Sequence, residues 1–184
     1  TNRHPKFVKD FPAGVKYYQF EEVKEALVGA DFVICGVSSF GVEWFKEEIL
    51  PILPENIPVI SVTKGLMDLP DGTLITYPDL WQKKLDSIGK HIPLCAIGGP
   101  CTSYELVAHD QTHVSFCGED LRVLEYIKSL METDYYHVSV TTDVVGVESA
   151  VALKNGYALG VALTVGVNQR EFGNDEIHYN SQAA

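Results

Sequence analysis

Strand-forming residues fill a short apolar run, Phe32-Val-Ile-Cys-Gly-Val37, which is flanked by Ala30-Asp31 and Ser38-Ser39. A continuous apolar run of this length between short polar residues is typical of a strand that is buried on both faces of a sheet. The same reasoning predicts four further strands, at residues 58–63, 92–97, 113–117 and 136–140.

Amphipathic segments lie between these runs. Residues 42–53 place Val42, Phe45, Ile49 and Leu53 on one helical face, and residues 121–131 have a similar spacing. Apolar strands that alternate with helices favour a parallel sheet covered on both faces, which is a doubly wound α/β fold. In this fold, ligands bind at the carboxyl ends of the strands.

The longest apolar run is residues 144–167, whose polar side chains are Glu148, Ser149, Lys154, Asn155 and Thr164. Its length suits a membrane span, but the charges of Glu148 and Lys154 argue against membrane insertion. A helix that is apolar nearly all round favours the buried spine of an all-α domain. We therefore expect a boundary near Thr141-Thr142, with domains at residues 1–141 and 142–184. Further residues or a second subunit should cover the helix.

The charge of the chain argues against several classes of partner. The 184 residues include 25 acidic and 14 basic ones, giving a formal net charge of -11. This balance opposes binding to nucleic acid or to anionic membranes, because both require a positive surface. The opening Thr1-Asn-Arg-His-Pro5 does not have the pattern of a signal peptide.

The four cysteines form no CxxC pair and have no Cys/His spacing suited to zinc; they are Cys35, Cys95, Cys101 and Cys117. We expect buried, reduced thiols, no metal site and a cytoplasmic location.

Lys154 is the sharpest candidate for chemistry. A lysine in a buried helix loses hydration, and this favours the neutral amine that a general base requires. The alternative is a lysine that extends its stem to the surface or pairs with Glu148. Asn155 follows directly and offers a donor that can orient a hydroxyl or a carbonyl group.

Three other candidate sites follow predicted strands. Lys64 ends the second strand, and Gly65 permits a tight turn directly after it. Gly98-Gly99-Pro100-Cys101-Thr102-Ser103 follows the third strand, and exposed amides there can hold phosphate or a nicotinamide. Ser38-Ser39-Phe40 follows the first strand and can pack against a dinucleotide. A solvated lysine, a plain turn and an ordinary loop are the respective alternatives.

Taken in order, these places resemble segments of one family. Residues 30–39 are similar to its acidic strand entry and Val-Pro-Ser loop, and Thr63-Lys64-Gly65-Leu66 to its Thr-Lys-Gly segment. Residues 99–105 are similar to its Gly-Pro-Ser/Thr-x-Ala-x-Glu segment. Asp143-Val-Val-Gly146-Val-Glu148, followed by Ala152-Leu153-Lys154-Asn155, resembles its Asp-x-x-Gly-Val-Glu and Ala-Leu-Lys-Asn segments. The family is the NAD-dependent glycerol-3-phosphate dehydrogenases.

The resemblance implies an oxidoreductase that interconverts sn-glycerol 3-phosphate and dihydroxyacetone phosphate with NAD, or alternatively NADP. It implies Lys154 as the general acid and base at the C2 oxygen, and Lys64 as a second catalytic residue beside the nicotinamide. Substrate contacts are implied for Lys64, Gly99, Cys101, Lys154 and Asn155, and cofactor contacts for Ser39, Phe40, Lys64 and Ser103.

The resemblance also bears on architecture and assembly. It implies an incomplete Rossmann-like, doubly wound parallel sheet, without the family's glycine-rich N-terminal turn, followed by the start of an all-α C-terminal domain. A phosphorylated small-molecule substrate and a homodimer are further implications.

Departures from the family pattern keep other readings open. Ser38, Cys101 and Ser103 stand where the family has Pro, Ser or Thr, and Ala, respectively. Another β-hydroxyacid-dehydrogenase-type NAD(P) oxidoreductase is therefore one alternative. A non-catalytic Rossmann-like interaction module is an alternative of a different class.

Overall fold

The computed structural model describes residues 10–172, with side chains described as far as Arg170. The chain divides into two compact units, residues 1–30 and residues 31–184. In the first unit, the short 3-10 turn η1 (Phe20–Glu22) leads into the single-turn helix α1 (Val23–Ala26). The backbone N–H of Gln19 donates to Glu22 Oε2 at 2.7 Å and fixes the start of this turn.

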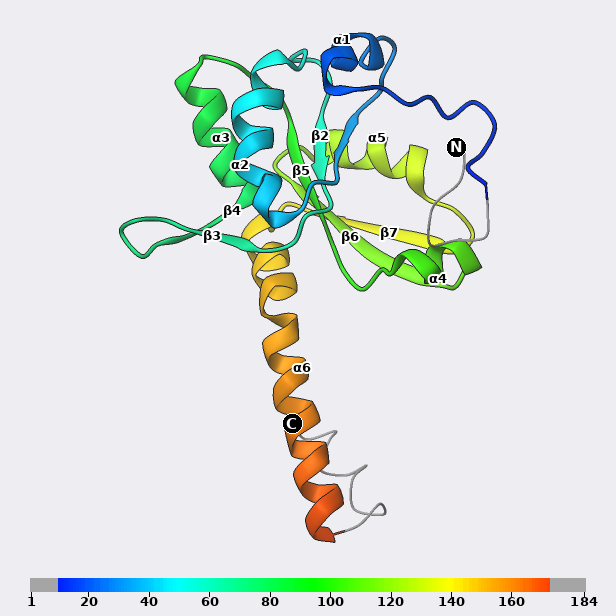
Figure 1. Cartoon of the computed structure of the whole chain (residues 1–184), viewed down its shortest axis with the longest axis vertical. Helices are drawn as coiled ribbons and strands as arrows, with labels where there is room; N and C mark the ends of the chain where they lie inside the picture. The colour runs from blue at the N-terminus through cyan, green and yellow to red at the C-terminus, as the bar shows by residue number, and fades with distance from the viewer. Residues whose placement is uncertain (1–9, 173–184) are drawn as a thin grey trace. The chain divides into compact units, whose positions relative to one another are not determined.

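The second unit is built on a five-stranded sheet with the order β1-β2-β5-β6-β7 (Figure 1). The strands are β1 (Val33–Cys35), β2 (Val59–Ser61), β5 (Leu94–Gly98), β6 (Thr112–Gly118) and β7 (Tyr136–Thr141). Each overlaps a run that the sequence predicts as a strand. The α/β prediction is confirmed, since β1, β2 and β5 are parallel to one another and β6 is parallel to β7.

One pairing differs from the wholly parallel sheet that the sequence predicts, because β6 runs antiparallel to β5. The helix between these strands, α4 (Ser103–Ala108), has 6 residues, and β5 has 5. At the usual rises per residue, α4 spans about 9 Å and β5 about 16 Å. A helix this short does not carry the chain back along the sheet, so β6 begins at the edge where β5 ends.

The predicted helix at residues 42–53 is present as a continuous helical segment. It follows the turn η2 (Ser39–Gly41) and consists of α2 (Val42–Trp44), the π-helical η3 (Phe45–Ile49) and η4 (Leu50–Ile52). The four side chains predicted to share its apolar face are all buried, namely Val42, Phe45, Ile49 and Leu53. The helical period of the sequence therefore identifies both the segment and its buried face.

A β-hairpin precedes the next helix and was not predicted. It consists of β3 (Leu66–Asp68) and β4 (Leu74–Thr76), which pair antiparallel, and it leads into α3 (Tyr77–Ser87). Thr76 caps α3, because its hydroxyl accepts a hydrogen bond from the Asp79 N–H at 3.2 Å.

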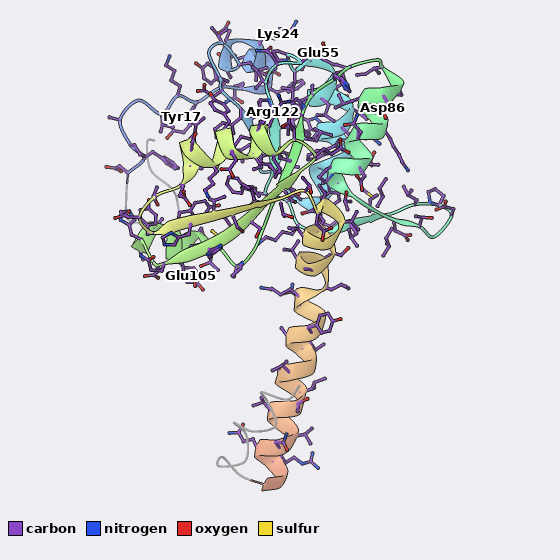
Figure 2. The ribbon with its side chains drawn as sticks, turned by 180° about the vertical axis from the view of Figure 1, so that it is seen from behind. Tyr17, Lys24, Glu55, Asp86, Glu105 and Arg122 are labelled. Atoms are coloured by element: carbon purple, nitrogen blue, oxygen red, sulfur yellow. The ribbon has the colours of Figure 1, made fainter. Side chains whose placement is uncertain are left out.

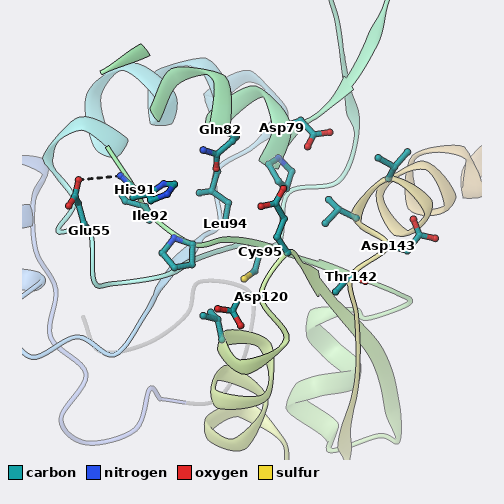
Figure 3. A pocket seen from close by; sticks show the side chains of 16 residues that line it. Glu55, Asp79, Gln82, His91, Ile92, Leu94, Cys95, Asp120, Thr142 and Asp143 are labelled. Carbon is teal, nitrogen blue, oxygen red and sulfur yellow. Dashed lines mark hydrogen bonds between the residues drawn. The ribbon is translucent and has the colours of Figure 1, made fainter. Parts of the chain in front are cut away.

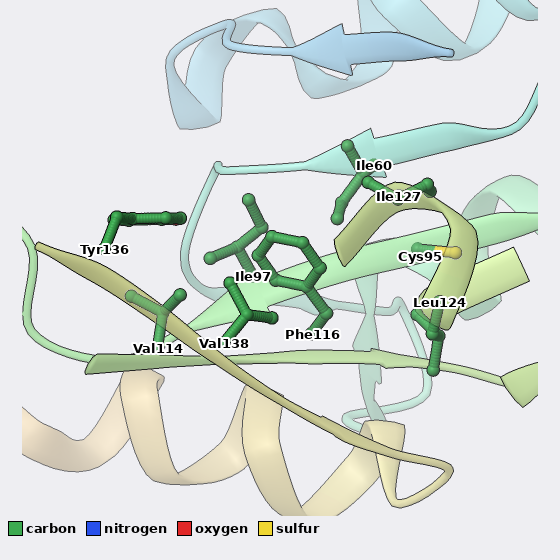
Figure 4. Close-up of a cluster of buried hydrophobic side chains, with 9 residues drawn as sticks. All are labelled: Ile60, Cys95, Ile97, Val114, Phe116, Leu124, Ile127, Tyr136 and Val138. Atoms are coloured by element: carbon green, nitrogen blue, oxygen red, sulfur yellow. The ribbon is translucent and has the colours of Figure 1, made fainter. Parts of the chain in front are cut away.

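A cluster of buried side chains lies between the sheet and α5 (Leu121–Met131), as Figure 4 shows. Its members are Ile60, Cys95, Ile97, Val114, Phe116, Leu124, Ile127, Tyr136 and Val138. Full burial of a large apolar side chain contributes roughly 1.5–3 kcal/mol. This cluster therefore holds α5 firmly against β2, β5, β6 and β7. The helix α6 (Val144–Phe172) lies on the opposite side of the sheet.

The first turns of α6 pack directly on β5. A Cβ added to Gly98 would lie 2.3 Å from Val147 Cγ1, so only glycine allows this approach. Further along, α6 extends past the edge of the sheet (Figure 2), where Tyr157, Leu159 and Leu163 are 74%, 61% and 61% exposed. The prediction of a buried spine is therefore wrong for this part of α6 within the described residues.

By length and hydropathy, Val144–Arg170 is long and apolar enough to cross a membrane. One such helix is weak evidence, because the core helices of soluble proteins meet the same criteria. The boundary predicted near Thr141-Thr142 lies within the second unit, between β7 and α6, and stays a prediction.

Candidate active site

The carboxyl ends of β2 and β5 bring two predicted site residues together. Lys64 follows β2, Gly99 follows β5, and these strands are parallel neighbours. The Lys64 ammonium donates a hydrogen bond to the Gly99 carbonyl oxygen, with Nζ and O 2.9 Å apart. The backbone at Gly99 has φ +126, and an added Cβ would lie 3.1 Å from His113 O. Glycine is therefore required where the chain turns beside Lys64.

The helix α6 crosses the sheet face and supplies the other side of this site. Lys154 and Asn155 line a cavity of about 330 Å³ together with Lys64 and Gly99. Its remaining lining residues are Gly65, Leu66, Val151 and Ala152. We call this space the lysine cavity. Four residues that the sequence singled out thus meet in one place, and two of them are lysines.

Lys154 is solvent-exposed. The expected buried environment is therefore wrong, and the exposure agrees with the alternative of a lysine that reaches the surface. The reason is that α6 extends past the sheet from this turn on, where residues 153–160 are all exposed. The predicted alternative pairing of Lys154 with Glu148 is absent among the described residues, since neither Glu148 oxygen has a hydrogen-bond partner there.

A second cavity of about 470 Å³ adjoins the first and shares Lys64 and Gly99 with it. Cys101 and Ser103 line this second cavity, whose other lining residues are Val62, Ile97, Leu106, Met131, Thr133, Tyr135 and Tyr136. We call it the apolar cavity. Burial raises the pKa of the Cys101 thiol, and the charge of Lys64 acts in the opposite direction. Cys101 is therefore a neutral thiol at neutral pH.

A capping box at the start of α4 fixes the backbone at Thr102, which lies between the cavity residues Cys101 and Ser103. The Thr102 N–H donates to Glu105 Oε2 at 3.1 Å, and the Thr102 hydroxyl donates to the same oxygen. These two hydrogen bonds satisfy donors at the start of α4, and they hold the backbone that joins Cys101 to Ser103.

Ser39 and Phe40 lie in η2, directly after β1. The loop before them is tied to the β2 loop, since the Thr63 hydroxyl donates to the Val37 carbonyl oxygen at 2.6 Å. Phe40 is 96% exposed, and neither Ser39 nor Phe40 lines the lysine cavity or the apolar cavity. Their predicted cofactor contacts stay predictions.

Glu148 is a feature whose burial sequence reasoning missed. Its side chain is completely buried, and within residues 10–172 both of its carboxyl oxygens lack a hydrogen-bond partner. Burial raises its pKa to about 7; the charge of Asp79 raises it further and that of Lys64 lowers it. The available signal was a lone carboxylate in the first turns of an otherwise apolar run.

Another cavity lies elsewhere, at the amino end of β5 (Figure 3). Its volume is about 520 Å³, and its lining includes Glu55, Asp79, Glu119, Asp120 and Asp143. This surplus of carboxylates disfavours an anionic ligand. The lysine cavity is therefore the better candidate for an anionic ligand, although it is smaller.

Within residues 10–172, no group of three or more His, Cys, Asp or Glu side chains gathers in a way that could hold a metal ion. The four cysteines are free thiols.

A mostly parallel sheet with lysine and glycine at adjacent strand ends defines a ligand-binding α/β domain of the doubly wound class. The family model described as NAD-dependent glycerol-3-phosphate dehydrogenase N-terminus matches residues 1–124, and the chain belongs to this family. The matched residues include Lys64, Gly99, Cys101 and Ser103, whereas Lys154 lies beyond them.

Relatives give the same family. The chain is 33% identical, over 159 residues, to the NADP(+)-dependent glycerol-3-phosphate dehydrogenase of Archaeoglobus fulgidus; the alignment covers 86% of this chain and 46% of that one. Against the glycerol-3-phosphate dehydrogenase [NAD(P)+] of Streptococcus gordonii, the identity is 28%, covering 91% and 48%. The chain thus spans about half the length of the curated relatives it matches.

A solved structure supports the fold. The glycerol-3-phosphate dehydrogenase of Coxiella burnetii superposes with a TM-score of 0.68 at 21% identity, covering 89% of this chain and 47% of that one. At this identity the likeness concerns the fold alone.

Proposed function

We propose that this chain is the cofactor-binding part, with one side of the substrate site, of an NAD(P)-dependent glycerol-3-phosphate dehydrogenase. The proposed enzyme interconverts sn-glycerol 3-phosphate and dihydroxyacetone phosphate. The observation that carries the proposal is the convergence of Lys64, Gly99, Lys154 and Asn155 on one cavity of about 330 Å³. Family membership supports the same reaction class.

The lysine cavity suits a small phosphorylated substrate. A phosphate monoester carries a charge of about −1.5 to −2 near neutral pH, and two lysines line the cavity. Its volume is about 330 Å³, at the lower end of the range of roughly 300–1,000 Å³ for ligand sites. A three-carbon phosphate therefore matches the cavity in both charge and size.

Lys154 is the proposed proton-transfer residue. In the reduction, its ammonium group gives a proton to the C2 carbonyl oxygen as the hydroxyl forms, and the neutral amine remains. In the oxidation, the neutral amine accepts the proton of the C2 hydroxyl. The position of Lys154 supports this role, because it lines the lysine cavity together with Lys64 and Asn155.

Lys64 and Asn155 are the proposed orienting residues. The hydrogen bond from Lys64 Nζ to Gly99 O restricts where the ammonium lies, so its remaining N–H groups have defined directions. Asn155 offers an amide donor next to Lys154, and Cys101 is a proposed neutral contact for the substrate.

The apolar cavity fits the nicotinamide end of the cofactor. Its lining is mostly apolar, and its polar groups come from Lys64, Ser103, Thr133 and two tyrosines, Tyr135 and Tyr136. When bound, the cofactor supplies or accepts the hydride at C2. Lys64 and Ser103 are the proposed contacts, with Ser39 and Phe40 contacting other parts of the cofactor.

Assembly and location are proposals of the same kind. A homodimer is supported by the exposed apolar side chains along α6, because a surface of this sort is normally covered. A cytoplasmic location is supported by four free cysteines.

The proposed function is tested with a panel of substrates. The full-length gene product is mixed with NADH or NADPH and either dihydroxyacetone phosphate or a short-chain keto acid, and the loss of reduced cofactor is followed by absorbance. Oxidation with dihydroxyacetone phosphate alone supports the proposal. Turnover with the keto acid alone favours another β-hydroxyacid-dehydrogenase-type enzyme. Absence of turnover, together with absence of thermal stabilisation by either cofactor, favours the interaction module.

A further inference from the structure

Glu148 lies in α6, one helical turn before two residues that line the lysine cavity. It precedes Val151 and Ala152, which line that cavity, by three and four residues, so the three side chains share a face of α6. The carboxyl group is fully buried, and both oxygens lack a hydrogen-bond partner among the described residues. An ionised carboxylate in such surroundings is strongly disfavoured unless a positive charge lies near it.

The titratable groups that face Glu148 come from three other elements. Tyr77 and Asp79 belong to α3, Cys117 to β6, and Lys64 to the loop after β2. Lys64 is the cation among these four, and its charge favours ionised Glu148, whereas that of Asp79 opposes it. The ionised form of Glu148 therefore depends on Lys64, which also faces the ligand cavity.

Ligand binding changes the charge around Glu148. An anionic ligand in the lysine cavity lies beside Lys64, the cation whose charge favours ionised Glu148. The negative charge of the ligand opposes ionised Glu148 and competes with it for Lys64. Protonation of Glu148 removes this repulsion.

We propose that Glu148 takes up a proton when an anionic ligand binds in the lysine cavity. The inference rests on the proposed function, because it requires an anionic ligand at this site. Glu148 is then a positioning residue. In the free protein its negative charge compensates the positive charge of Lys64, and in the complex the anionic ligand does so instead. Because the bound state holds the proton more strongly, the ligand binds more tightly below neutral pH than above it.

Titration calorimetry tests this proposal on the full-length gene product. Glycerol 3-phosphate is titrated in the presence of saturating NADH, a combination that cannot react because both compounds are reduced. Running the titration near pH 7 in two buffers of different ionisation enthalpy gives the number of protons exchanged. With a pKa of about 7 in the free protein, wild type should take up as much as about half a proton per ligand through Glu148.

Glu148→Gln keeps the shape of the side chain and removes its proton exchange, whereas Glu125→Gln alters an exposed carboxylate on α5 and serves as the matched control. The proposal expects the Glu148 variant to lose the proton uptake and the control to keep it. We also expect the Kd for glycerol 3-phosphate to rise between about pH 7 and pH 8. The rise should be larger in wild type than in Glu148→Gln, by a factor of as much as about five.

Two results overturn the inference. Equal proton exchange in wild type and Glu148→Gln removes Glu148 from the linkage and leaves the proposed function intact. Absence of glycerol 3-phosphate binding to wild type defeats both proposals. Should Glu148→Gln fail to fold, infrared difference spectra of wild type decide: a protonated-carboxyl C=O band that grows on ligand addition supports the inference, and its absence contradicts it.

Discussion

Replacing Glu148 by Gln should change how the free energy of unfolding depends on pH. In the folded protein the pKa of Glu148 is raised to about 7 from an ordinary value of 4.5, first by burial and then by the charge of Asp79. The folded state therefore binds this proton more strongly than the unfolded state does. The stabilisation is fully present below about pH 4.5 and is lost as the pH rises through about 7.

The size of the effect follows from the two pKa values. The difference between 4.5 and about 7, at about 1.4 kcal/mol for each unit, gives about 3 kcal/mol as an upper bound. Urea unfolding at about pH 5 and about pH 8 measures it in wild type, Glu148→Gln and the Glu125→Gln control. We expect wild type and the control to lose up to about 3 kcal/mol more than Glu148→Gln between these pH values. Equal losses in all three proteins would show that Glu148 does not bind a proton more strongly in the folded state.

Three further expectations concern packing, capping and assembly. Gly98→Ala places a Cβ 2.3 Å from Val147 Cγ1, so it should lower the free energy of unfolding by about 1–3 kcal/mol in urea denaturation. The control Gly160→Ala, with open space at its Cβ, should instead raise it by up to about 1 kcal/mol. Thr102→Ala removes the cap of α4 and should cost about 1 kcal/mol in the same assay; an unchanged midpoint contradicts the capping role. Leu163→Glu places a charge on exposed α6 and should shift a dimer of the full-length gene product toward monomer in sedimentation velocity; an unaltered dimer excludes this helix from the interface.

Sequence reasoning succeeded where one local pattern determines the structure. The apolar runs identify the strands, and the helical period identifies the buried face from Val42 to Leu53, because alternation and period report burial directly. The convergence of Lys64 and Gly99 was also predictable, since parallel neighbouring strands end at one edge of the sheet.

It failed where the outcome depends on how elements connect or how far they extend. The antiparallel direction of β6 follows from the shortness of α4, and apolar composition does not carry that information. The exposure of Lys154 follows from where α6 passes the sheet edge, and an apolar helix has the same pattern whether it is covered or not.

The β3–β4 hairpin is a different kind of failure, because a signal was present in the sequence. Pro70-Asp71-Gly72 between two short apolar runs is a turn pattern. In the structure Gly72 has φ +82, and the Thr73 N–H donates to Asp71 Oδ1 at 2.9 Å. The turn residues were sufficient to predict the hairpin.

The most direct test of the account is the turnover of the full-length gene product with and without the Lys154 amine. NADH absorbance is followed with dihydroxyacetone phosphate for wild type, Lys154→Ala and Lys83→Ala, the last removing an exposed lysine of α3 as a control. We expect turnover by wild type and by the control, with kcat of Lys154→Ala lower by about 10²-fold or more. Turnover by Lys154→Ala equal to that of wild type would contradict the assignment of Lys154 as the proton-transfer residue.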